Sequence, residues 1–133
     1  MGRIQGMPLV AQASALLAGA IHVWFFVLES VLFGRPGVAA RFGLRTAEQI
    51  AAVRPMAFNQ GFYNLFLAIG VAAGIAQIAA GEEAVGRALV LFCCACMVGA
   101  GIILFATSRR FLQASIVQAL PPLVAILATL LIR

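Results

Sequence analysis

The side chains best suited to chemistry stand in the segment Asn59-Gln60-Gly61-Phe62-Tyr63-Asn64, at the head of an apolar run that ends near Ala80. Its hydrogen-bonding members are Asn59, Gln60, Tyr63 and Asn64. On a helix, which turns about 100° per residue, these four project within an arc of about 140°. A polar helix face inside a membrane must look into the bundle or into a water-filled cavity. The segment therefore predicts one wall of a ligand-binding pocket.

Two ionisable residues, His22 and Glu29, lie seven residues apart in an earlier apolar run. This spacing predicts one shared helix face, with about 10 Å between them along the axis. A carboxylate in hydrocarbon must be paired, neutralised or hydrated, and histidine titrates near neutrality. We predict that they are catalytic, as an acid–base or proton-handling pair. The alternatives are that Glu29 reaches the interface or pairs with Arg35 or Arg54, and that His22 donates to a backbone carbonyl.

The composition places these residues in a membrane. The chain is 64% hydrophobic and 10% charged, whereas roughly 25% charged residues is usual for soluble domains. It contains four apolar runs, each long enough to cross a ~30 Å hydrocarbon core. We predict an all-α, polytopic membrane protein: a four-transmembrane-helix bundle forming a single domain over residues 1–133. The net charge of +5 does not indicate nucleic acid, because the nine basic residues are scattered over short loops.

The expected membrane helices cover residues 8–33, 56–80, 84–107 and 111–132. The Gly34-Arg35-Pro36-Gly37 segment ends the first of them. Thr46-Ala47-Glu48-Gln49 has a capping-box pattern, which predicts a short interfacial helix at about 47–54 between helices one and two. Pro55 is expected to end that short helix. Pro121-Pro122 removes two backbone donors and predicts a bend in the last helix.

The arginines predict an orientation. Six lie on one side of the expected spans and three on the other, and the positive-inside rule places the six in the cytoplasm. The six are Arg35, Arg41, Arg45, Arg54, Arg109 and Arg110; the three are Arg3, Arg87 and Arg133. Both termini are then expected outside.

This topology gathers most polar side chains in the cytoplasmic leaflet. The group comprises His22, Glu29, Asn59, Gln60, Tyr63, Asn64, Gln113 and Gln118. The outer leaflet keeps only a few, such as Gln12 and Gln77. We predict a cytoplasm-facing pocket walled by the first, second and fourth helices, with Asn59, Gln60, Tyr63, Asn64 and Gln118 binding the ligand. The alternative is that these side chains only hold helices together, through hydrogen bonds that average about 0.6 kcal/mol.

The cysteines Cys93, Cys94 and Cys96 are close neighbours on one expected helix. Such neighbours rarely meet disulfide geometry, and no second pair of soft ligands accompanies them. Buried cysteines commonly behave as small hydrophobes. We therefore predict neither a disulfide nor a metal site, and no motif in the chain names a cofactor.

With these motifs located, the chain resembles the family of small membrane proteins named domain of unknown function 1304. The resemblance rests on His22 and Glu29, on the segment from Asn59 to Asn64 with Leu65-Phe66-Leu67-Ala68 after it, and on Gln118 with Pro121. It implies four membrane helices with these polar residues as the signature, and we expect a bacterial cytoplasmic membrane. The chain departs from the family's pattern at Glu29-Ser30-Val31, where an acidic residue is often followed by Met and Phe.

Three functions remain open. The preferred hypothesis is a membrane-embedded protein that binds or transforms a small lipophilic molecule, with the lipid bilayer as its surroundings. The second is a small proton-coupled transporter working as a homodimer, although the outer leaflet is poor in the polar groups that it needs. The third is a structural or accessory subunit, whose small-residue faces on the first and third helices bind a partner.

Overall fold

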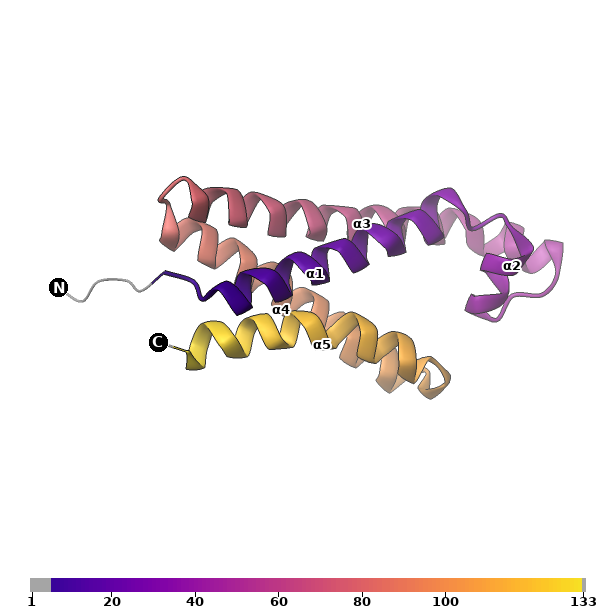
Figure 1. The fold of residues 1–133 in the computed structure, drawn as a ribbon. Coiled ribbons are helices and arrows are strands. Elements are labelled where there is room, and N and C mark those ends of the chain that lie inside the picture. Colours follow the sequence, from indigo (N-terminus) through magenta and orange to yellow (C-terminus); the bar gives the residue numbers. More distant parts are fainter. Residues whose placement is uncertain (1–5, 133) are drawn as a thin grey trace. The chain divides into compact units, whose positions relative to one another are not determined.

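The computed structural model describes residues 6–132, and every regular element in that range is helical (Figure 1). In chain order they are α1 (Leu9–Phe26), the π-helical turn η1 (Val27–Val31), α2 (Pro36–Ala39), the 3-10 turn η2 (Ala40–Phe42), α3 (Ala47–Ala79), α4 (Glu83–Thr107), the 3-10 turn η3 (Arg109–Phe111) and α5 (Leu112–Leu131). Four stretches are long and apolar enough to cross a membrane: Leu9–Val31, Ala47–Ala79, Glu83–Thr107 and Arg109–Leu131. The predicted fold class is thereby confirmed.

The chain divides into two compact units. The first unit consists of the residues up to Ile21 together with those from Leu67 onward, and the second unit is His22–Phe66. The single domain expected for residues 1–133 stays a prediction. So does the orientation in the membrane; of the arginines counted for it, Arg3 and Arg133 lie outside the described residues.

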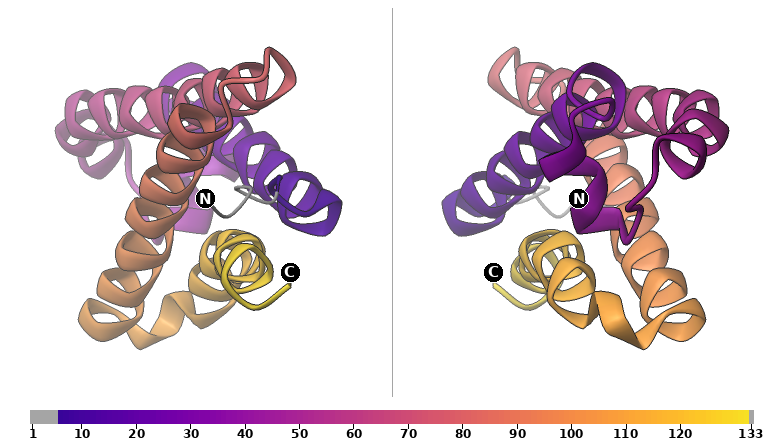
Figure 2. Two further views of the ribbon diagram at one scale, coloured as in Figure 1. Left: turned by 90° about the vertical axis from the view of Figure 1, so that its left-hand side faces the viewer. Right: turned by 90° about the vertical axis from the view of Figure 1, so that its right-hand side faces the viewer.

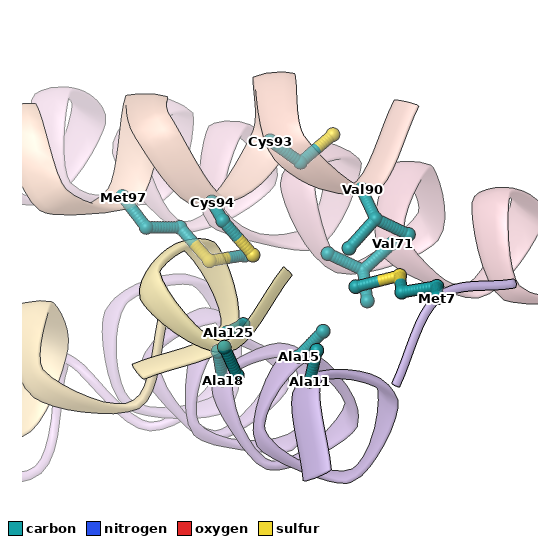
Figure 3. Close-up of a cluster of buried hydrophobic side chains, with 11 residues drawn as sticks. Met7, Ala11, Ala15, Ala18, Val71, Val90, Cys93, Cys94, Met97 and Ala125 are labelled. Atoms are coloured by element: carbon teal, nitrogen blue, oxygen red, sulfur yellow. The ribbon is translucent and has the colours of Figure 1, made fainter. Parts of the chain in front are cut away.

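The core of the first unit is built from small residues on all four of its helices. Ala11, Ala15 and Ala18 of α1 are fully buried, as are Val90, Cys94 and Met97 of α4. Figure 3 shows them gathered with Val71 of α3 and Ala125 of α5. Cys93 and Cys94 are free thiols in this core, so they act as small apolar side chains in the packing.

Glycines set the closest helix approaches in the first unit. A Cβ on Gly86 of α4 would stand 2.8 Å from the backbone nitrogen of Ile78, and one on Gly74 of α3 would stand 2.8 Å from the Gly86 carbonyl oxygen. A Cβ on Gly101 would stand 3.1 Å from the Ser115 carbonyl oxygen of α5, which returns against α4 after the η3 turn (Figure 2). Small residues let membrane helices pack closely in this way. The structural-subunit hypothesis assigns the small-residue face of α4 to a partner protein. Two glycines of α4, Gly86 and Gly101, instead pack against other helices of this chain.

Polar contacts tie the ends of the first unit. The Glu83 carboxylate accepts a hydrogen bond from the backbone N–H of Met7, ahead of α1. The Arg87 guanidinium donates to the Thr129 carbonyl oxygen (3.1 Å) in the last turn of α5. A cation at this position also complements the negative end of the helix dipole. Glu83 and Arg87 thus join the start of α4 to both neighbouring helix ends.

In the second unit, the connection between α1 and α3 is ordered. α1 continues into η1 and ends before Gly34, and Pro36 opens α2 at a position where its missing N–H costs no helical bond. Gly43 then takes a left-handed conformation (φ +81°) that ends η2. The rings of Phe33 and Phe42 contact each other, with centroids 5.2 Å apart. The short helix predicted between helices one and two is present, but at residues 36–42 rather than 47–54.

The prediction that Pro55 ends a separate helix is wrong, because α3 runs unbroken from Ala47 to Ala79 with Pro55 inside it. Proline has a helical φ and removes only one backbone bond, the one to the carbonyl four residues earlier. Water or neighbouring groups can satisfy that carbonyl near a membrane surface. Residues 47–54 are therefore the first turns of a membrane-crossing helix.

The capping box at the start of α3 is present as predicted. Thr46 Oγ1 accepts a hydrogen bond from the Gln49 N–H, and Gln49 Oε1 accepts from the Thr46 N–H, both at 3.2 Å. We expect Thr46→Ala to lower the free energy of unfolding by about 1 kcal/mol, because the Gln49 N–H loses its partner. Thermal unfolding followed by circular dichroism would measure this, and an unchanged midpoint would show that the cap contributes nothing in the intact chain.

Candidate functional site

The candidate site lies in the second unit, where α3 presents a line of small residues at spacings of three and four. Ala57, Gly61 and Asn64 are buried along this line. A Cβ on Gly61 would overlap Ser30 Oγ and would stand 3.1 Å from the Ser30 nitrogen and 3.2 Å from Glu29 Cβ. The absence of a side chain at Gly61 is therefore what lets the turn carrying Glu29 and Ser30 approach α3.

That turn is π-helical. The Leu32 N–H donates to the Val27 carbonyl oxygen at 2.9 Å, a bond between residues five apart. Single π turns inside α-helices occur frequently at functional sites. Adjacent residues on a helix point about 100° apart, yet Glu29 and Ser30 both hydrogen bond to α3. The α1 span thus meets α3 on both sides of Gly61.

Two hydrogen bonds bracket Gly61. Ser30 Oγ donates to the Phe58 carbonyl oxygen at 2.8 Å, three residues before the glycine. Asn64 Nδ2 donates to Glu29 Oε2 at 2.8 Å, three residues after it. Asn64 is almost completely buried (5% exposed), so this bond is shielded from competing solvent. The position of the carboxylate is therefore determined by a second helix as well as by its own.

The Glu29 carboxylate has no cationic partner within residues 6–132. Pairing with Arg35 or Arg54 was an alternative, but Arg54 instead lies beside Gly34, its Cζ and Nη1 3.9 Å from where a Cβ on that glycine would stand. The half-buried Glu29 uses Oε2 for Asn64, and Oε1 is not among the buried side-chain atoms that lack a partner. Within the described residues Oε1 accepts no hydrogen bond, so it is left to accept one from another partner.

His22, the other predicted catalytic residue, is fully buried in α1. Its ring meets Phe25 edge to face, with centroids 5.4 Å apart. The regular α-helical spacing that predicts a shared face for His22 and Glu29 ends at Phe26, where η1 begins. No hydrogen bond between the two residues is found in the described part of the chain, and their joint catalytic role stays a prediction.

The remaining polar residues of the segment lie on other faces of α3. Asn59, Gln60 and Tyr63 are exposed, and none of them forms a side-chain hydrogen bond with the part of the chain that the structure describes. Side-chain direction on a helix follows the position in the turn. Residues 57, 61 and 64 share the face that contacts η1, and Asn59 and Tyr63 project away from that face. Of the polar arc predicted from the sequence, Asn64 alone meets Glu29.

The length of α3 indicates the depth of these residues. Its 33 residues span about 50 Å, whereas the hydrocarbon core is about 30 Å thick. If the hydrocarbon core ends at Ala79, about 20 residues fill it, and Asn59 and Gln60 fall at its other boundary. Tyr63 then lies where aromatic residues commonly anchor helices. An exposed position is thus less costly for these three than it would be at mid-membrane.

Gln118 belongs to the first unit, half-buried in α5. Its grouping with Glu29 in one pocket stays a prediction.

Two residues that matter for this geometry were not assigned roles from the sequence. Gly61 is an isolated glycine in a helix, which signals close packing, and Ser30 follows Glu29 directly. A further contact is aromatic: Phe62 lies between Phe26 and Phe58, with centroid distances of 5.1 and 5.0 Å. Such ring pairs add about 0.5–1.5 kcal/mol beyond the apolar area they bury.

Comparison with known proteins agrees with the resemblance seen in the motifs. No curated protein and no solved structure matches the chain. A family model, described as protein of unknown function (DUF1304), matches residues 16–130. That range includes η1, the whole of α3, and Gln118. The chain therefore belongs to the DUF1304 family.

Proposed function

We propose that this protein binds a small lipophilic molecule through a polar end group that donates a hydrogen bond to Glu29. The observation that carries this proposal is the Glu29 carboxylate, which lies in a stretch long and apolar enough to cross a membrane, is held by one neutral amide and has no cationic partner among residues 6–132. A carboxylate in such a place is costly and marks functional sites in membrane proteins. A ligand amine or hydroxyl would supply the second partner at Oε1, while its apolar part stays in the surrounding lipid.

In this proposal each site residue has a defined part. Glu29 binds the polar group and is the acid–base residue if a reaction follows, with His22 as its predicted companion. Asn64 positions the carboxylate through the 2.8 Å hydrogen bond. Asn59, Gln60 and Tyr63 are exposed on other faces of α3, and in this proposal they contact the outer part of the ligand.

A second candidate function, a structural subunit, is favoured by one specific observation. The Ser30–Phe58 and Asn64–Glu29 bonds bracket the Gly61 approach, as expected of polar groups that lock two helices together. In that case Glu29 serves stability, and its neutral amide analogue, which can still accept from Asn64, should behave almost as the native residue does.

The test uses Trp24, the single tryptophan of the chain, which lies in the second unit and is half exposed. Its fluorescence is titrated with decylamine, decanol and decanoate on the detergent-solubilised native protein and on Glu29→Gln. We expect native binding in the order amine, alcohol, carboxylate, and at least tenfold weaker amine binding by Glu29→Gln, because a charge-assisted hydrogen bond is lost. The matched control is Glu82→Gln, which removes an exposed carboxylate in the first unit.

Native mass spectrometry of the same proteins detects small molecules that co-purify with them. A small molecule carried by the native protein and by Glu82→Gln, but not by a folded Glu29→Gln variant, supports the proposal. Equal amine affinity in the native protein and Glu29→Gln rules it out and leaves the structural subunit.

A further inference from the structure

The connection between α1 and α3 carries a concentrated positive charge. Residues 34–54 contain four arginines, Arg35, Arg41, Arg45 and Arg54, and a single acidic residue, Glu48. All four arginines are exposed, and none forms an ion pair within the described range 6–132. Exposed arginines without acidic partners next to a membrane span attract anions.

The backbone around these arginines is ordered. The Arg35 carbonyl oxygen accepts from the Val38 and Ala39 N–H groups at 2.9 and 3.0 Å, which fixes the start of α2. The Arg45 N–H donates to Gln49 Oε1 at 2.8 Å, as part of the cap of α3. The backbone positions of Arg35 and Arg45 are therefore fixed, which lowers the entropy lost when these residues bind a partner.

The Arg54 side chain, on α3, lies close to Gly34 at the beginning of this connection. Its guanidinium Cζ and Nη1 lie 3.9 Å from the position that a Cβ on Gly34 would take, and Gly34 directly precedes Arg35 in the chain. Arg54 thus adds a positive charge within about one residue of the Arg35 backbone. Two guanidinium groups can bind the oxygens of one phosphate in a bidentate manner.

The depth of Arg54 indicates what kind of phosphate this is. Arg54 stands 25 residues before the end of α3 at Ala79, or about 38 Å along the axis. This exceeds the ~30 Å core by about 8 Å, which corresponds to the headgroup layer. Lipid phosphates are concentrated at that level, which favours a phospholipid headgroup as the occupant of this site.

We propose that Arg35 and Arg54 form a binding site for the phosphate of an anionic phospholipid, and that Arg41 and Arg45 strengthen it by their charge. The site is separate from the Glu29 carboxylate and does not depend on the ligand proposed there. It also gives the arginines a role beyond setting the orientation of the chain.

The experiment places the full chain in nanodiscs of phosphatidylcholine containing a minor fraction of phosphatidylglycerol and counts the lipids retained in native mass spectrometry. We expect the native protein to retain phosphatidylglycerol in preference to phosphatidylcholine. The R35Q/R54Q variant should lose this preference by about 25-fold, since each basic residue at the surface adds about fivefold to anionic lipid affinity and two are removed.

The matched control is R109Q/R110Q, which removes the same charge from the connection between α4 and α5. In that connection Arg109 and Arg110 lie over the rings of Phe105 and Phe111. The control should keep the native preference. An unchanged preference in R35Q/R54Q, or an equal loss in both variants, overturns the site. The single variant R54Q is measured in parallel, and it decides the question if the double variant loses its helical circular dichroism.

Discussion

Replacing Gly61 with alanine is expected to lower the free energy of unfolding by about 2 kcal/mol, because the added methyl group has no room. Its position lies 3.1 Å from the Ser30 backbone nitrogen and 3.2 Å from Glu29 Cβ, and it overlaps Ser30 Oγ. A rotation of the Ser30 hydroxyl would relieve the overlap with Oγ, but it would break the hydrogen bond to the Phe58 carbonyl oxygen. The contacts with the Ser30 nitrogen and Glu29 Cβ would remain.

The measurement is unfolding of the detergent-solubilised protein followed by circular dichroism. The control is Gly37→Ala in the same unit, where an added Cβ meets nothing within 4 Å. That variant should be neutral or slightly stabilising, since alanine is the better helix former. If Gly61→Ala proves as stable as Gly37→Ala, the close approach of η1 to α3 does not exist in the folded protein. Amine binding should weaken in Gly61→Ala, because a displaced η1 carries Glu29 away from Asn64.

A larger loss, about 3 kcal/mol or more, is expected for Gly86→Ala in the first unit. The added methyl would meet the Gly74 carbonyl oxygen, the Ile78 nitrogen at 2.8 Å and Ile78 Cγ1 at 2.6 Å. Two of these three atoms belong to the α3 backbone, which cannot rotate away as a side chain can. The helices α3 and α4 would have to separate, and the core around Val90 and Cys94 would lose its close packing.

Helix α4 contains its own control for this prediction. Gly99 lies on the exposed side of the same helix, and a Cβ there meets nothing within 4 Å. Unfolding midpoints of Gly86→Ala and Gly99→Ala, compared in the same detergent, separate the packing effect from the change in helix propensity. Equal midpoints would contradict the tight α3–α4 approach. A Gly86→Ala protein that fails to accumulate, beside a normal yield of Gly99→Ala, would agree with it.

The four membrane-crossing helices could be predicted because the length of an apolar run is a local property of the sequence. The capping box at Thr46 and Gln49 could be predicted for the same reason, since its bonds join residues three apart. Pro55 shows where a local rule fails. Proline removes one helical hydrogen bond, and α3 continues only if the remaining bonds and contacts outweigh that loss. The residues next to Pro55 do not show whether they do.

For the candidate site, the sequence indicated Glu29 and the segment from Asn59 to Asn64 because polar groups in an apolar run are costly. Which of them meet was decided by the register between two helices. The π turn η1 and the glycine at position 61 place Glu29 against Asn64 and Ser30 against the Phe58 carbonyl oxygen. Neither feature follows from hydropathy or from a regular period of 3.6 residues.

The amino-acid sequence by itself determined that this protein is helical and suited to a membrane, where three of its four spans begin and end to within a few residues, and which side chains are costly to bury. The exception is the start of α3, which lies at Ala47 and not at residue 56. The tertiary structure decided that Asn64, and not Asn59, Gln60 or Tyr63, holds the Glu29 carboxylate, and that Gly61 and Gly86 set the distances between helices. The physical reason is the sequence separation of the interacting residues. Hydropathy and helix capping depend on residues that are near neighbours in the chain. Helix contacts depend instead on the shapes of faces that lie tens of residues apart and meet only when the chain has folded.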